Sequence, residues 1–198
     1  LLQEERIPVE FVSNDVAARL DYSFLHHRYS GDISIGRAET QFAGYRPFAW
    51  GAKTDFSIGQ DEIQVRSLSA TSEGSRLQGG GTITDLRHPV FKGSYDLLLD
   101  LQQASAVTRQ PKTTSGKLQL RGTAMWSPST YNTGGEFDLK SASWNDAMFS
   151  AKDLAASGHY TFDPQKVSLA QVQGRALGGT FSSELDVTNW NAPEKPVK

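Results

Sequence analysis

A short apolar pattern recurs four times along this chain, and each copy follows a polar segment. In each copy two apolar residues stand two positions apart, and a third follows three positions later. The four copies are Ile33, Ile35 and Ala38; Ile63, Val65 and Leu68; Phe137, Leu139 and Ala142; and Val167, Leu169 and Val172. The second copy begins 30 positions after the first (63 against 33), and the fourth begins 30 positions after the third (167 against 137). Such internal repetition is typical of extended, repeat-built architectures.

The spacing within each copy predicts a β-strand that contains a bulge. Side chains two positions apart share one face of a strand, and the extra step before the third apolar residue shifts that pattern by one residue, as a bulge does. The polar segments before the copies contain glycine, proline and aspartate, which favour hairpin turns. We therefore predict turns at 30–32, 59–62, 134–136 and 163–166.

The composition favours one large antiparallel sheet. Apolar residues make up 37% of the chain and the mean hydropathy is −0.46. This apolar content is too low for strands buried on both faces, so one face of the sheet is expected to be exposed to solvent. The 20 basic and 22 acidic residues are scattered along the chain, so no nucleic-acid partner is expected. Because the chain contains no cysteine, disulfides and thiolate metal sites are excluded.

The ends of the chain suggest a piece of a longer protein. The first residue is Leu1, with neither an initiator methionine nor a secretory leader. Pro193 and Pro196 give residues 191–198 the character of a linker. We therefore expect one repeat-built β segment over 1–190, followed by a linker over 191–198.

Alternation of apolar and polar residues identifies the clearest strands. The pattern is strongest at 91–101 and at 117–126, and the whole chain accommodates on the order of 10 to 13 strands. Residues 14–28 fit either a strand or a short helix near the N-terminus, and the strand is preferred because every neighbouring segment is β. Residues 104–114 are predicted to be the longest loop.

No residue set carries convincing catalytic or metal-binding chemistry. His26 and His27 are adjacent, and neighbours on a strand point to opposite faces, so they are a poor metal pair. Asp96 and Asp100 resemble the paired carboxylates of a glycosidase, but they fall on the polar face of the best strand, where solvation keeps both ionised. We predict no enzyme activity, no cofactor and no metal.

The apolar side of such a sheet has to be shielded from water, since each Å² left exposed costs roughly 25 cal/mol. The chain offers at most one helix, so the sheet has to cover itself. It can close into a sandwich with a filled core, or it can form an open trough that holds hydrocarbon. Periodicity predicts the same inward residues for both.

A resemblance to a known family favours the trough. Residues 160–190 have a strand, a polar turn, alternating apolar residues, a glycine-rich step around Leu177 and a second alternating strand. Residues 61–101 are similar, with Leu77 before Gly79 and a D-L-x-x-P element at 85–89. Both segments resemble the repeat of the AsmA-like superfamily, the TamB/AsmA-type periplasmic proteins.

The resemblance implies an all-β fold: a long, curved, mostly antiparallel sheet that forms a half-open hydrophobic groove. The one short helix allowed near the N-terminus comes from the pattern of residues 14–28, which have no counterpart in the family repeat. It also implies a periplasmic location, a parent protein anchored in the inner membrane, and phospholipid as the partner, with outer-membrane assembly proteins reached through the parent chain. Acyl chains would slide along the groove without a covalent step. The residues expected to line the groove are Ile33, Ile35, Ile63, Val65, Leu97, Leu99, Leu101, Leu118, Leu120, Phe137, Leu139, Val167, Leu169, Leu177, Phe181 and Leu185.

Two alternatives remain open from the sequence. The first is a structural or adhesive β-sandwich or solenoid module with a filled core. The second is a carbohydrate-active β-sandwich enzyme, which requires two carboxylates to converge beside Trp126 or Trp144.

Overall fold

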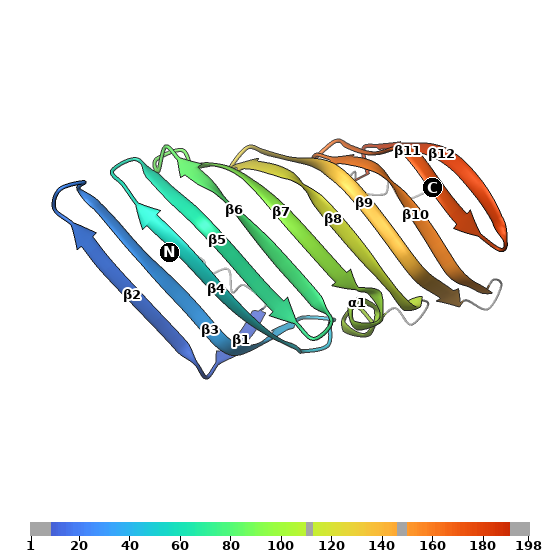
Figure 1. The fold of residues 1–198 in the computed structure, drawn as a ribbon, viewed down its shortest axis with the longest axis horizontal. Helices are drawn as coiled ribbons and strands as arrows, with labels where there is room; N and C mark the ends of the chain where they lie inside the picture. Colours follow the sequence, from blue (N-terminus) through green and yellow to red (C-terminus); the bar gives the residue numbers. More distant parts are fainter. Residues whose placement is uncertain (1–8, 110–112, 146–149, 191–198) are drawn as a thin grey trace, which may run out of the picture.

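The chain forms one long, curved and open antiparallel sheet (Figure 1). The computed structural model describes residues 9–109, 113–145 and 150–190. Its elements are β1 (Val9–Ser13), β2 (Val16–Ser23), β3 (Arg28–Phe42), β4 (Phe48–Ile58), β5 (Glu62–Ser72), β6 (Ser75–Thr84), β7 (Val90–Asp100), α1 (Leu101–Val107), β8 (Thr113–Ser127), β9 (Thr130–Asn145), β10 (Ser150–Phe162), β11 (Lys166–Ala176) and β12 (Gly179–Thr188).

The topology is an up-and-down meander. From β3 to β12 each strand pairs with the next along the chain, and β1 and β2 both pair with β3 and so form one edge. The strands lie side by side from β2 at one end of the molecule to β12 at the other (Figure 1). All described strands belong to this one sheet, so the predicted all-β curved sheet is confirmed, and the closed sandwich is not the architecture of the described residues.

Each of the four repeat copies contains the bulge that its spacing predicts. The pairing register shifts between Ile35 and Ala38 against β4, and between Val65 and Leu68 against β6. The corresponding shifts in copies three and four are at 139–142 against β10 and at 169–172 against β12. In these two bulges Ser141 and Gln171 take left-handed backbone conformations, with φ of 50° and 52°.

Two of the four predicted turns are wrong. The turns at 59–62 and 163–166 join β4 to β5 and β10 to β11 as expected. Residues 30–32 and 134–136 lie inside β3 and β9, and the preceding hairpin turns come earlier in the chain. The glycines there allow close approach of neighbouring strands instead, because a Cβ on Gly31 would lie 2.1 Å from the carbonyl oxygen of Arg19.

The expected position of the helix is also wrong. Residues 16–23 form β2, as the preferred strand interpretation of 14–28 required, and no helix lies in the described N-terminal region. The helix is α1, which replaces the last residue of the strand predicted at 91–101 and the first four residues of the loop predicted at 104–114. Asp100 caps it, because one carboxylate oxygen accepts hydrogen bonds from the backbone N–H groups of Gln102 and Gln103, each at 3.0 Å.

The sheet has almost no closed core. Among the described residues the buried apolar side chains are small: Ala38, Ala142, Ala151 and Val172. Three of these are the third residues of repeat copies, so in three of the four copies the residue after the bulge is buried. No large side chain of the described residues is fully buried.

Candidate apolar binding face

The pairing register places apolar residues of successive strands on one side of the sheet. Residues directly opposite each other in an antiparallel pair share a face. One row can be followed from partner to partner across ten strands: Ile33, Thr54, Leu68, Gly79, Tyr95, Gly122, Gly135, Tyr160, Leu169 and Leu185. We call this side the apolar face and the opposite side the polar face.

Neighbouring rows on the apolar face are also hydrophobic. On one side of the first row lies the row Ile35, Ala52, Ala70, Leu77, Leu97, Leu120 and Phe137. Near the other margin lies the row Tyr29, Ile58, Ile63, Ile83, Phe91, Trp126 and Tyr131. The apolar face is therefore continuous along the length of the sheet.

The structure brings together all but two of the residues predicted to line the groove. The fourteen that share the apolar face are Ile33, Ile35, Ile63, Val65, Leu97, Leu99, Leu118, Leu120, Phe137, Leu139, Val167, Leu169, Phe181 and Leu185. Leu101 lies apart from them as the first residue of α1. Leu177 lies in the turn between β11 and β12 and is 69% exposed.

Sequence reasoning missed the contribution of β4. Phe48, Trp50, Ala52, Phe56 and Ile58 lie on the apolar face, as their pairing with β3 and β5 shows. The signal was present, because these residues alternate with Ala49, Gly51 and other small or polar residues at the period of a strand. The first two repeat copies lie on β3 and β5, and β4 lies between them without a copy of its own.

Glycines on the apolar face make room for aromatic rings. Tyr95 on β7 and Tyr160 on β10 stand at opposite ends of a four-residue stretch of the first row, with Gly122 and Gly135 between them. Their hydroxyl groups hydrogen-bond above β8 and β9, and the Tyr95 hydroxyl also lies 2.5 Å from Thr133 Oγ1. Burial and the hydrogen bond to Tyr95 raise the pKa of Tyr160.

The same device recurs elsewhere on this face. A Cβ on Gly93 would lie 2.6 Å from the ring of Phe91, and one on Gly174 would lie 2.4 Å from the ring of Phe181. These rings therefore lie over glycine backbone, an arrangement that compensates for the missing side chain. Ring surface covers the glycine positions, so the apolar character of the face is not interrupted there.

An apolar hollow of about 220 Å³ lies on this face near α1. Its walls include Phe48, Trp50, Ala70, Leu77 and Leu97. Trp50 is fixed by a 2.7 Å hydrogen bond from its Nε1 to Thr40 Oγ1, and its ring centroid lies 5.9 Å from that of Phe11.

Helix α1 is tied to the β5–β6 hairpin at the margin of this hollow. Gln103 donates from Nε2 to Ser72 Oγ at 2.6 Å, and its Oε1 accepts from Ser75 Oγ at 2.7 Å. Ser72 and Ser75 both line the hollow. The Gln103 side chain therefore joins α1 to this hairpin, and near the other end of the helix the backbone N–H of Arg46 donates to the carbonyl oxygen of Val107 at 2.9 Å.

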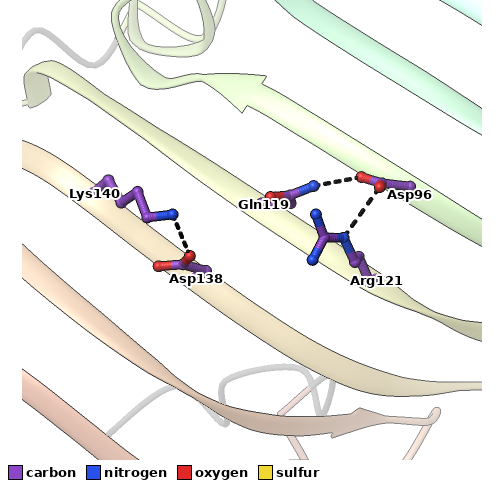
Figure 2. Close-up of polar contacts among 5 residues, drawn as sticks. All are labelled: Asp96, Gln119, Arg121, Asp138 and Lys140. Carbon is purple, nitrogen blue, oxygen red and sulfur yellow. Dashed lines mark hydrogen bonds and ion pairs between the residues drawn. The ribbon is translucent and has the colours of Figure 1, made fainter.

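The polar face carries ion pairs and amide contacts, some between neighbouring strands and some within one strand. Asp96 accepts hydrogen bonds from Gln119 Nε2 at 2.9 Å and from Arg121 Nε at 3.1 Å, and Lys140 Nζ lies 2.7 Å from Asp138 Oδ2 (Figure 2). The hydrogen bond from Gln119, with that from Arg121, holds the pKa of Asp96 below its usual value. Such a carboxylate stays ionised, which does not suit a general acid.

Metal-binding and membrane-spanning features do not appear in the described residues. No group of three or more histidine, aspartate or glutamate side chains in them is placed to hold a metal ion. His26 and His27 both lie in the turn between β2 and β3. Within the same residues no helix is both long and apolar enough to cross a bilayer.

Comparison of the chain with protein families, curated proteins and solved structures found no match. The family resemblance therefore rests on the repeat pattern and its glycines. The observations that bear on function are the register, the exposure and the chemistry of the two faces.

Proposed function

We propose that this chain is a segment of an envelope-spanning AsmA/TamB-like protein that binds phospholipid acyl chains on its apolar face and guides them along the sheet. This assignment places the segment in the periplasm, within a parent protein anchored in the inner membrane, where it contributes to outer-membrane biogenesis. The observation that carries the proposal is a continuous apolar face with no packed layer over it in the described residues.

The uncovered face favours a hydrocarbon ligand. Side chains of this face such as Ile33, Trp126 and Leu185 remain substantially exposed although they belong to ordered strands. Leaving apolar surface in water costs roughly 25 cal/mol per Å², and an exposed apolar patch of this extent usually marks a binding surface. Acyl chains remove that surface from water without a covalent step.

The geometry suits movement along the sheet. With neighbouring strands about 4.8 Å apart, the nine steps from β3 to β12 give a path of about 43 Å along the first row. No charged side chain interrupts that row. The hydroxyl groups of Tyr95 and Tyr160 in this row hydrogen-bond to each other, so a passing acyl chain does not have to strip water from them.

Lipid analysis tests the proposal directly. The protein is produced in a diderm bacterium, purified without detergent and analysed by native mass spectrometry and by lipid extraction. We expect co-purified phospholipid that is displaced by added fatty acid. Protein that carries no lipid and does not bind a fluorescent fatty acid would contradict the proposal.

A pair of variants on one strand tests the face. Leu97→Asp places a charge on the apolar face, and Ser94→Asp places the same charge on the polar face of β7. Because a carboxylate is costly to desolvate, we expect Leu97→Asp to reduce photo-crosslinking of a diazirine phospholipid by about tenfold or more. Ser94→Asp is the matched control and should crosslink like the parent protein. Equal crosslinking in both folded variants would show that the apolar face is not the lipid path.

A further inference from the structure

Strand β2 leaves one edge of the sheet open. In the described residues β2 pairs with β3 alone, so the backbone groups on its other side have no strand partner. Val16, Leu20 and Tyr22 project on the apolar face with exposed fractions of 62%, 58% and 39%. An eight-residue edge that is apolar on one face is a ready template for another strand.

The charges on the polar face of β2 are complementary to themselves under two-fold symmetry. Arg19 and Asp21 share that face, since they are paired with Asp32 and Ser30 of β3. In an antiparallel pair of two β2 strands with Leu20 opposite Leu20, the residue before Leu20 in one copy stands opposite the residue after Leu20 in the other. Positions 19 and 21 are therefore opposite each other. Each Arg19 then faces the Asp21 of the other copy, and the contact occurs twice.

The opposite edge of the sheet lacks this property. Strand β12 is equally exposed, but its charged residues are Glu184 and Asp186, and it contains no basic residue. In a symmetric pair of β12 strands centred on Leu185, each Glu184 would face the Asp186 of the other copy, and like charges across strands are destabilising. Lys166 lies 3.1 Å from Asp186 in its own copy, but no basic residue of β12 faces Glu184 in such a pair. The β2 edge is therefore the better site for self-association.

We propose that two copies of this chain associate by antiparallel pairing of their β2 strands, with Leu20 opposite Leu20 on a two-fold axis normal to the sheet. Rotation about that axis reverses the strand direction and keeps the apolar faces of both copies on the same side. The two sheets become one sheet with a continuous apolar face, and the interface is isologous. This association depends on the edge geometry and not on the lipid proposal.

Disulfide trapping tests the register. The chain has no cysteine, so Leu20→Cys provides a single thiol that can reach only the same thiol of another copy. Directly opposite residues in a sheet have Cβ atoms about 5 Å apart, close to disulfide distance. We expect mild oxidation to convert Leu20→Cys to a covalent dimer, and Ser183→Cys at the middle of β12 to remain monomeric.

Charge exchange tests the complementarity. In sedimentation equilibrium we expect Arg19→Asp and Asp21→Arg each to weaken the dimer by about tenfold or more, and the double variant to recover to within about threefold. A monomeric parent protein at high concentration would overturn the proposal. So would crosslinking through Ser183→Cys, or mixed Leu20→Cys and Ser183→Cys dimers, because these outcomes place β12 in the interface.

Discussion

Replacement of Gly135 by alanine is the sharpest test of how the apolar face is built. Gly135 on β9 pairs with Gly122 on β8, beneath the hydrogen-bonded hydroxyl groups of Tyr95 and Tyr160. A Cβ at position 135 would lie 1.9 Å from the carbonyl oxygen of Arg121 and 2.6 Å from the Cα of Gly122. Both obstacles are backbone atoms, so no side chain can rotate away to relieve the clash.

The expected loss of stability follows from the distance by which β8 and β9 have to separate to accommodate the new Cβ. An ordinary contact of a Cβ begins near 3.4 Å, so β8 and β9 have to separate locally by about 1.5 Å. That separation disrupts at least two interstrand hydrogen bonds worth about 1 kcal/mol each, and it adds overpacking strain of about 1 kcal/mol or more. We expect Gly135→Ala to lower the free energy of unfolding by about 3 kcal/mol.

Urea unfolding followed by circular dichroism measures this change. With a slope of about 2 to 3 kcal/mol per molar urea, the midpoint should fall by about 1 M or more. Gly179→Ala is the control, because the nearest atom to its new Cβ is 3.7 Å away, and its midpoint should stay close to that of the parent. A loss below about 1 kcal/mol for Gly135→Ala would show that β8 and β9 are not packed as described.

Substitutions at two further positions test the polar contacts. Asp100→Ala removes the N-cap of α1 and should lower the free energy of unfolding by about 1 kcal/mol in urea titrations, whereas Asp100→Asn, which can still cap, should cost less; equal losses would argue against capping. Asp96 has a lowered pKa in the folded state, so its contribution to stability is present above the unfolded pKa and is lost as the pH falls through the folded pKa. The urea midpoint should therefore fall less between pH 6 and pH 3 in Asp96→Asn than in the parent, and an identical fall would refute this role for the hydrogen bond from Gln119.

The strand pattern could be predicted because its cause is local. Ile33, Ile35 and Ala38 alternate at the period of a strand and then slip by one position, and the pairing register slips at the same place. The same relation between spacing and register holds in the other three copies. The alternation of side chains within one strand shows directly which of its faces is apolar, so composition and spacing were sufficient to predict the fold class.

The glycines and the helix were misjudged because their causes are not local. Gly31 and Gly135 looked like turn residues, but strands from elsewhere in the chain approach them too closely for a Cβ. The seven-residue helix α1 is too short to show a period of its own. Its cap, Asp100, also continued the alternation of β7, so the sequence extended the strand through Leu101.

By itself the sequence determined that this protein is a one-sided β-sheet with bulges at the repeats, because alternation and spacing act within single strands. Only the tertiary structure decided that the described strands form one open sheet, that Tyr95 and Tyr160 meet across two intervening strands, and that β2 leaves an edge with self-complementary charge. The physical reason is that register and closure depend on contacts between residues far apart in the chain. Two sheets with the same alternation can close on themselves or stay open, and the resulting difference in exposed apolar surface is what gives this protein its candidate binding face.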